Sequence, residues 1–348
     1  MTRGVGPGMG TRQGFVRGAV FGVWWAILAW TGAPVSAQAL GALIQVQGQP
    51  LSGGRVSGSA VVPLERARGG DTPVLTFATD LGPVRLLLDT GATSSMVRPE
   101  LAVRLGLRPL PLAPGAFRLA GGGADCQTLQ PQRLTLPPMR MAGLRLLGVE
   151  ALVLPVAALP AGVDGVLGVP SLRLLPVAVD PLAQRLSLGL RAWAPRGLRL
   201  QPRQTLPLRW FRGVPLVGLQ TLAGRVEALA DSGAEGLFLS PALAARLHPL
   251  NHPEPLEMVG FCGTQTVQRQ TFVGLAFAPP LSGTQAPLGP GQPDALDPAA
   301  LEQPREGIIT QNPIFSQLGV AAIVGQELLR QRPQLWRLDL KEPRLELW

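Results

Sequence analysis

The chain has 348 residues, of which 46% are hydrophobic and 15% are charged, and its formal net charge is +9. This composition excludes a disordered or fibrous protein and is sufficient for two compact domains. The 31 basic residues are almost all arginines, scattered singly and without a basic run interleaved with aromatic residues. The positive charge therefore does not predict a nucleic-acid partner.

Residues 1–37 have the pattern of a secretory signal peptide. Three arginines precede an uncharged apolar run at residues 18–33, and small residues follow as far as Ala37, where we expect cleavage. The apolar run is shorter than the roughly 20 residues that span a bilayer, so no stable membrane span is expected after signal cleavage. We predict export to the periplasm or the extracellular space. The alternative is a retained N-terminal segment that tethers the chain to a membrane.

The next residues predict a linker followed by a first domain. Residues 38–70 are rich in Gly and Gln and show no hydrophobic period, so we interpret them as a linker or a loosely held leading strand. A first domain is expected over residues 71–190. It begins with two β-rich runs that form a hairpin and deliver Asp89 at the end of the second strand. Pro99 and the apolar residues that follow it at helical spacing predict a short helix.

Asp89 raises a physical question, because it lies between apolar runs in the stretch LLLDTGATSSMV. An ionisable carboxyl is costly to bury, so it needs a partner that shares the cost. An internal repeat supplies one. Shifted by 142 positions, residues 82–105 align without a gap with residues 224–247, share 11 of 24 residues, and pair Asp89 with Asp231. The sequence therefore predicts an internal duplication.

Both copies follow the same plan over a longer range. Each has an Asp-Thr/Ser-Gly-Ala loop, a short helix, and a later turn of two apolar residues and a glycine, at Gly168 in the first copy and Gly325 in the second. We expect residues 191–205 to connect the two domains and residues 206–348 to form the second. A Pro- and Gly-rich insertion at 278–307 predicts irregular structure, either a tolerated surface loop or a lid beside a cleft.

Two such loops in register, each with its own apolar-apolar-Gly turn, resemble the aspartic peptidases. The DTGA form is most similar to the retropepsin-like branch, and the resemblance covers roughly residues 70–348. It implies an all-β, bilobal acid-protease fold with two pseudo-twofold-related, barrel-like lobes and short helices. The activity that it implies is that of an aspartic endopeptidase, which hydrolyses polypeptides without a cofactor or a metal.

The resemblance also assigns the site. Asp89 and Asp231 are the expected catalytic pair, which shares one proton because two adjacent carboxyls cannot both ionise. A water held between them would attack the peptide carbonyl. The hydroxyls beside the aspartates would bond across to the opposite loop, and the glycines would permit close approach. These supporting residues are Thr90, Gly91, Ser232 and Gly233.

Some residues depart from the pepsin pattern. Ala92 and Ala234 stand where pepsin-like relatives often carry a hydroxyl that bonds to the aspartates, so we expect the pair to work at a less acidic pH than in pepsin. Glu235 follows Ala234 and could raise the pKa values of the pair further. The chain has no tyrosine, so the flap tyrosine of pepsin has no counterpart.

Two hairpins, at residues 117–136 and 256–277, are candidates for the flaps that cover the cleft in this family. The candidate residues at their tips are Gly122, Gly123, Cys126, Cys262 and Gly263. Two cysteines in an exported chain are consistent with one disulfide. If the flap tips meet, a Cys126–Cys262 bond would tie them together as a redox latch. The alternatives are a bond that only stabilises the fold, and two separate thiols.

Two other functions compete with the peptidase. The first is a catalytically inactive, exported peptide-binding relative of the same fold. The second is a carbohydrate- or surface-binding β module, which leaves the paired aspartates unexplained. Because Asp89 and Asp231 belong to one chain, we expect a monomer to be sufficient for activity.

Overall fold

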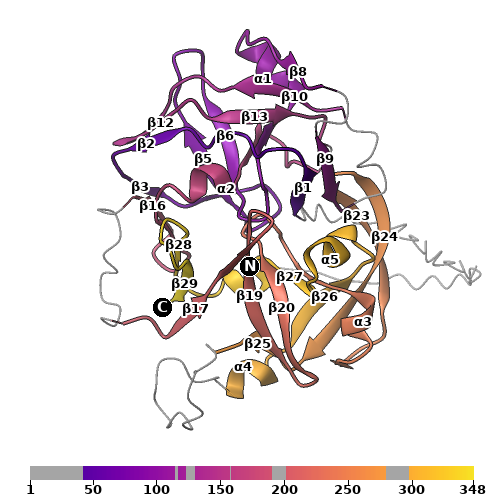
Figure 1. The fold of residues 1–348 in the computed structure, drawn as a ribbon. Helices are drawn as coiled ribbons and strands as arrows, with labels where there is room; N and C mark the ends of the chain where they lie inside the picture. Colours follow the sequence, from indigo (N-terminus) through magenta and orange to yellow (C-terminus); the bar gives the residue numbers. More distant parts are fainter. Residues whose placement is uncertain (1–41, 114–116, 123–129, 157, 190–200, 280–297) are drawn as a thin grey trace, which may run out of the picture. The chain divides into compact units, whose positions relative to one another are not determined.

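The computed structural model describes residues 42–113, 117–122, 130–156, 158–189, 201–279 and 298–348 (Figure 1). Strands dominate these residues. The helices among them have at most six residues: α1 (Pro99–Arg104), α2 (Val169–Leu172), α3 (Pro241–Ala244), α4 (Pro298–Glu302), α5 (Pro313–Leu318) and α6 (Gln326–Leu329). The expected all-β class is therefore confirmed. In the part of the chain that the structure describes, no helix is long and apolar enough to cross a membrane.

The first lobe is built on an eight-stranded sheet. Its strands, in spatial order, are β4 (Glu65–Arg66), β5 (Pro73–Phe77), β6 (Val84–Leu88), β14 (Gly165–Leu167), β7 (Ser95–Val97), β13 (Glu150–Val153), β10 (Gln132–Thr135) and β8 (Leu110–Pro111). Strand β14 enters the middle of the sheet, parallel to β6 and antiparallel to β7. This arrangement places the end of β6, and hence Asp89, at the centre of the lobe.

The second lobe repeats this order. Its strands are β18 (Arg209–Phe211), β19 (Val214–Thr221), β20 (Gly224–Ala230), β27 (Ala322–Val324), β21 (Leu237–Leu239), β26 (Arg305–Ile309), β24 (Gly263–Val273) and β22 (His248–Pro249). Strand β27 again enters between β20 and β21, parallel to the first and antiparallel to the second. The repeat seen in the sequence is therefore a repeat of topology, and the bilobal acid-protease fold is confirmed.

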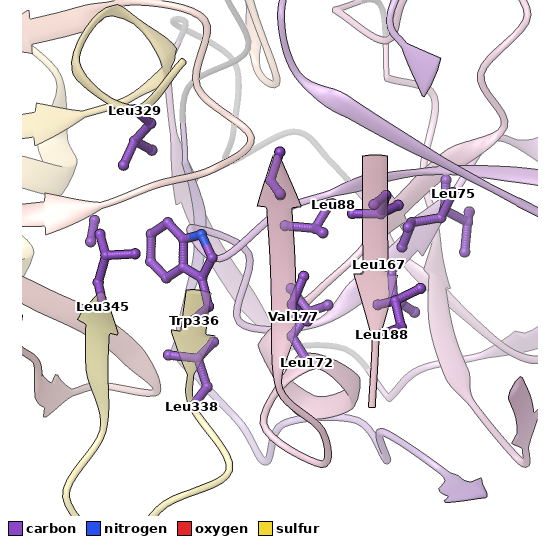
Figure 2. Packing of buried hydrophobic residues seen from close by; sticks show 14 of the residues in the cluster. Leu75, Leu88, Leu167, Leu172, Val177, Leu188, Leu329, Trp336, Leu338 and Leu345 are labelled. Carbon is purple, nitrogen blue, oxygen red and sulfur yellow. The ribbon is translucent and has the colours of Figure 1, made fainter. Parts of the chain in front are cut away.

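A six-stranded sheet takes strands from both halves of the chain. Its order is β17 (Gln204–Pro207), β29 (Arg344–Leu347), β28 (Gln334–Arg337), β15 (Val177–Asp180), β16 (Arg185–Leu188) and β3 (Ala60–Pro63). The β15–β28 pair joins the two halves. Figure 2 shows Trp336 and Leu345 of one half in the same cluster as Val177 and Leu188 of the other. The indole of Trp336 is fully buried, so this sheet contributes to one continuous core.

Smaller strands complete the described fold. These are β1 (Leu43–Gln47), β2 (Arg55–Ser57), β9 (Arg118–Gly121), β11 (Met139–Met141), β12 (Leu144–Leu147), β23 (Glu254–Gly260) and β25 (Leu275–Phe277). Strand β1 pairs with β9, strands β11, β12 and β2 form a sheet, β23 pairs with β24, and β25 pairs with β19.

The local predictions around Asp89 are confirmed. Strands β5 and β6 form the expected hairpin, with Val74 opposite Leu87. Helix α1 begins with Pro99, whose missing N–H has no partner to lose in a first turn. Its twin α3 begins with Pro241, and the Ser240 side chain caps it by accepting a bond from the N–H of Leu243.

Several expected boundaries need correction or lie outside the described residues. The expected linker at residues 38–70 contains strands β1 to β4, because its short apolar runs pair with distant strands. The insertion expected at 278–307 contains α4 and the start of β26, so irregular structure does not extend to its end. The connection at 191–205 ends in β17. The signal peptide at 1–37 lies outside the described residues.

Candidate active site

Each aspartate is placed by a strand that lies beside it. The N–H of Asp89 donates to the carbonyl of Leu167 at 3.2 Å, and the N–H of Asp231 donates to the carbonyl of Val324 at 2.9 Å. Leu167 and Val324 end the inserted strands β14 and β27. The apolar-apolar-Gly turn that the sequence repeats is therefore the support behind each aspartate.

The two loops pack directly against each other. A Cβ on Gly91 would lie 2.4 Å from the carboxyl carbon of Asp231, and a Cβ on Gly233 would lie 2.4 Å from that of Asp89. Any side chain larger than hydrogen would collide there. The N–H of Gly91 donates to Asp89 at 2.8 Å, and the N–H of Gly233 donates to Asp231 at 2.9 Å. The structure thus brings the predicted pair together and gives both glycines the close-approach position expected of them.

Four hydrogen bonds cross between the loops at Thr90 and Ser232. The Thr90 hydroxyl donates to the carbonyl of Ala230 at 2.7 Å and accepts from the N–H of Ser232 at 2.9 Å. The Ser232 hydroxyl donates to the carbonyl of Leu88 at 2.9 Å and accepts from the N–H of Thr90 at 3.0 Å. Each hydroxyl therefore satisfies two backbone groups of the opposite loop, and the two halves of the network are symmetric.

Burial makes ionisation of the pair difficult. Asp89 is 1% exposed and Asp231 is fully buried. Loss of solvation, the neighbouring Asp231 charge and the contact with that carboxyl raise the pKa of Asp89 well above its usual range. Loss of solvation raises the pKa of Asp231 to about 6, although bonds from Asp89 and from the backbone N–H groups favour its charged form. The pair can therefore hold one proton near neutral pH.

The residues after the dyad loops have roles that sequence reasoning missed. The Thr93 hydroxyl accepts a bond from the N–H of Gln45 at 2.7 Å. In the second copy, the Glu235 carboxylate accepts bonds from the N–H groups of Asp71 and Thr72 at 2.7 and 3.0 Å. Thr93 and Glu235 occupy the same position in the repeat, so the alignment could have paired them. Their backbone partners are 48 to 164 residues away in the sequence, and no sequence pattern identifies them.

The structure gives Glu235 a different role from the expected one of raising the pKa values of the pair. Its carboxylate accepts hydrogen bonds from the backbone N–H groups of residues 71–72. The raised pKa values of Asp89 and Asp231 have other causes, chiefly burial. Two other polar side chains reach the second loop: the Gln326 amide donates to the carbonyl of Ser232 at 2.7 Å, and the Thr72 hydroxyl donates to the carbonyl of Gly233 at 3.3 Å.

The candidate flaps meet at their tips. The N–H of Cys262 donates to the carbonyl of Gly122 at 2.8 Å, and a Cβ on Gly260 would lie 2.4 Å from the same oxygen. Gly263 has a φ of 105°, which suits the tight turn between β23 and β24. Gly123 lies outside the described residues.

The cysteines are only partly described. Cys262 is buried and disulfide-bonded. Cys126, the only other cysteine of the chain, lies outside the described residues. The Cys126–Cys262 bond therefore stays a prediction, as does its use as a redox latch. Among the described residues, no group of three His, Cys, Asp or Glu is placed to hold a metal ion.

The close packing at Gly91 gives a first prediction. Gly91→Ala should reduce turnover by at least about 100-fold, because the new methyl group would lie 2.4 Å from the Asp231 carboxyl carbon and must displace that carboxyl. Initial rates on a peptide substrate measure this loss. Gly106→Ala is the matched control, since Gly106 has a positive φ of 62° and open space around its Cβ position. Equal rates for Gly91→Ala and Gly106→Ala would contradict the prediction.

Comparison with known proteins agrees with this geometry over part of the chain. Residues 76–171, which include Asp89 and its supporting strand β14, match a family model described as aspartyl protease. The first lobe is similar to the aspartyl proteases. The second lobe repeats the topology of the first and supplies the second aspartate of the pair.

Two solved structures are reported as similar. Basic 7S globulin from soybean has a TM-score of 0.39 and 11% identity, and the match covers 83% of this chain and 94% of the globulin. Conglutin gamma, a basic 7S globulin from lupine seeds, has a TM-score of 0.41 and 10% identity, with 83% and 95% covered. The comparison with curated proteins found no match.

Proposed function

We propose that the chain is an aspartic endopeptidase that hydrolyses polypeptides with a water activated between Asp89 and Asp231. One observation carries this proposal: the two carboxyls contact each other, on loops that a symmetric set of four hydrogen bonds involving Thr90 and Ser232 holds together. A fold that needed these loops only for packing would not need two titratable groups at its centre, where burial is costly.

The chemistry follows from one shared proton. The ionised carboxyl takes a proton from the water while the water oxygen bonds to the peptide carbon. The protonated carboxyl gives its proton to the carbonyl oxygen. This yields a neutral tetrahedral diol. The proton taken from water then passes to the leaving nitrogen as the C–N bond breaks, and a diol hydroxyl returns a proton to the other carboxylate. The products are a carboxylic acid and an amine, and the pair again holds one proton.

The test is cleavage profiling on a peptide library over pH 3–8 with residues 38–348 and with its Asp89→Asn variant. Cleavage by the first protein and none by the second supports the proposal. A specific observation favours the inactive peptide-binding alternative, namely the near-complete burial of both carboxyls. That alternative predicts peptide binding without cleavage by either protein, including under conditions that open the cleft.

The pH dependence gives a second prediction. Because the pKa of Asp231 is about 6 and that of Asp89 is raised well above its usual range, we expect the singly protonated pair to form as pH rises through about 6. Turnover should therefore increase from pH 4 to pH 7 and fall only when the remaining proton is lost. The profile of kcat/KM between pH 3 and 9 measures this, with circular dichroism as the control for unfolding. A maximum below pH 4 would contradict the prediction.

We further propose that a monomer is sufficient, since both aspartates and all four crossing bonds come from one chain. Specific activity should then be independent of protein concentration from nanomolar to micromolar. Sedimentation velocity at the same concentrations is the control. A steep loss of specific activity on dilution, together with dissociation, would count against a monomer.

Export remains part of the proposal, resting on residues 1–37 of the sequence.

A further inference from the structure

Strand β1 lies between the first flap and the catalytic loop. It pairs antiparallel with β9 of that flap, with Leu43 opposite Gly121 and Ile44 opposite Ala120. Figure 1 shows β1 and β9 side by side, away from β2, the next strand in the chain. An extended segment that adds itself to the edge of another strand is the usual geometry of a bound peptide.

The catalytic loop also holds β1 by its backbone. The Leu43 carbonyl accepts a bond from the N–H of Thr93 at 3.3 Å, and the N–H of Gln45 donates to the Thr93 hydroxyl at 2.7 Å. Thr93 is four residues after Asp89. These bonds use only main-chain atoms of β1, so any extended peptide in this position could make them.

The side chains of residues 42–44 alternate between the two lobes. Leu43 is buried in a cluster with Ala92 and Leu119 of the first lobe. Ala42 and Ile44 are buried in a cluster with Ala234 and Met258 of the second lobe. Ala92 and Ala234 directly follow the two dyad loops, so the strand crosses the space between them. Ala42, which directly precedes β1, and Leu43 and Ile44 of β1 are each at most 1% exposed.

The geometry points to β1 as an occupant of the substrate cleft: residues 42–47 hold the place of a substrate strand, and the cleft selects extended peptides with aliphatic side chains alternating toward the two lobes. The inference rests on the proposed peptidase function. It accounts for the burial of both aspartates, because a cleft that already contains a strand leaves no path for solvent. The chain is then latent until β1 leaves.

The chain around β1 suits a strand that can be released. Residues 48–50, directly after it, are exposed, and Gly48 and Gly54 have positive φ values of 98° and 76°. Strand β2 begins only at Arg55. Proteolysis or displacement at residues 48–50 would free β1 without breaking a hydrogen bond of the six-stranded sheet, whose first strand in the chain is β3.

The test is a Leu43→Asp, Ile44→Asp double variant of residues 38–348, which places two charges in apolar surroundings and expels the strand. Its kcat/KM on peptides should exceed that of the unchanged protein by about tenfold or more, because an occupied site lowers the competent fraction. Gln49→Asp, at an exposed position, is the matched control and should leave kcat/KM unchanged. A peptide of residues 40–49, LGALIQVQGQ, should inhibit the double variant, and a scrambled peptide should not.

A chain beginning at Pro50 covers the case in which the double variant does not fold. Thermal melts establish folding, and binding of fluorescent LGALIQVQGQ provides a readout that needs no catalysis. If both altered proteins fold and cleave no faster than the unchanged chain, and the peptide neither binds nor inhibits, the strand is a permanent structural element and the inference is overturned. If no protein cleaves any peptide but LGALIQVQGQ binds the opened forms, the peptidase proposal fails and the peptide-binding cleft stands.

Discussion

Replacing either aspartate by asparagine should abolish turnover and raise the melting temperature at neutral pH. Asn cannot exchange the proton that the reaction needs, so Asp89→Asn and Asp231→Asn should each lower kcat by at least about 1,000-fold. The amide oxygen can still accept the bonds that the N–H groups of Gly91 and Gly233 donate. The fold should therefore persist, and the loss of activity should come from the chemistry alone.

The stability effect has a definite sign. The folded-state pKa values of both aspartates lie above 3.8, so the folded protein binds more protons than the unfolded chain between pH 4 and about 6. Stability from these groups is present at low pH and is lost as pH rises. Asn removes this loss. A pKa raised from 3.8 to about 6 corresponds to a gain on the order of 1–3 kcal/mol at pH 7.

Thermal melts of both variants at pH 3 and pH 7 measure this effect, which should be large at pH 7 and vanish at pH 3. Asp80→Asn is the matched control. Asp80 is an exposed carboxyl whose pKa is lowered by its hydrogen bond and charge interaction with Arg140, so its pH dependence has the opposite sign. Full activity in either dyad variant would reject the shared-proton mechanism, and destabilisation at pH 7 would reject the pKa argument.

How far the sequence predicts this site depends on how local each contact is. The two aspartates, their glycines and their hydroxyl residues could be predicted from the sequence, because the duplication repeats the loop and each copy identifies the other. The strand that supports each loop could also be predicted, because it ends in an apolar-apolar-Gly turn. Its glycine is required, since a Cβ on Gly168 would lie 2.7 Å from the carbonyl oxygen of Ala92, and one on Gly325 would lie 2.3 Å from that of Ala234.

The place of β1 could not be predicted in this way. Its five residues contain too short an apolar run to identify a partner, and its bonds reach Thr93, 48 residues away, and β9, more than 70 residues away. Such pairing is decided by tertiary structure. Thr93 and Glu235 illustrate the same limit, because two different side chains at one repeat position each bind a backbone segment that the other copy lacks.

Removing one hydroxyl of the crossing network should destabilise the site more than an ordinary hydrogen-bond deletion. Ser232→Ala leaves the buried N–H of Thr90 and the carbonyl of Leu88 without partners, and Thr90→Val does the same to the N–H of Ser232 and the carbonyl of Ala230. Each unpaired buried group costs about 1–3 kcal/mol, so the two groups left in each variant should lower its stability by about 2–6 kcal/mol.

Turnover in these variants should fall by about 10- to 1,000-fold, because the carboxyls lose the alignment that the network imposes. Ser232→Thr and Thr90→Ser keep the hydroxyls and should retain most activity, because this repeat position is Thr in the first copy and Ser in the second. Thr76→Val, which removes an exposed hydroxyl bonded to Glu65, is the control.

In the Thr90→Val, Ser232→Ala double variant, the second substitution should cost less stability than the first, since the network is already broken. Denaturant melts and kcat measure both effects. Strict additivity, or activity retained without either hydroxyl, would show that the loops align the aspartates by packing alone.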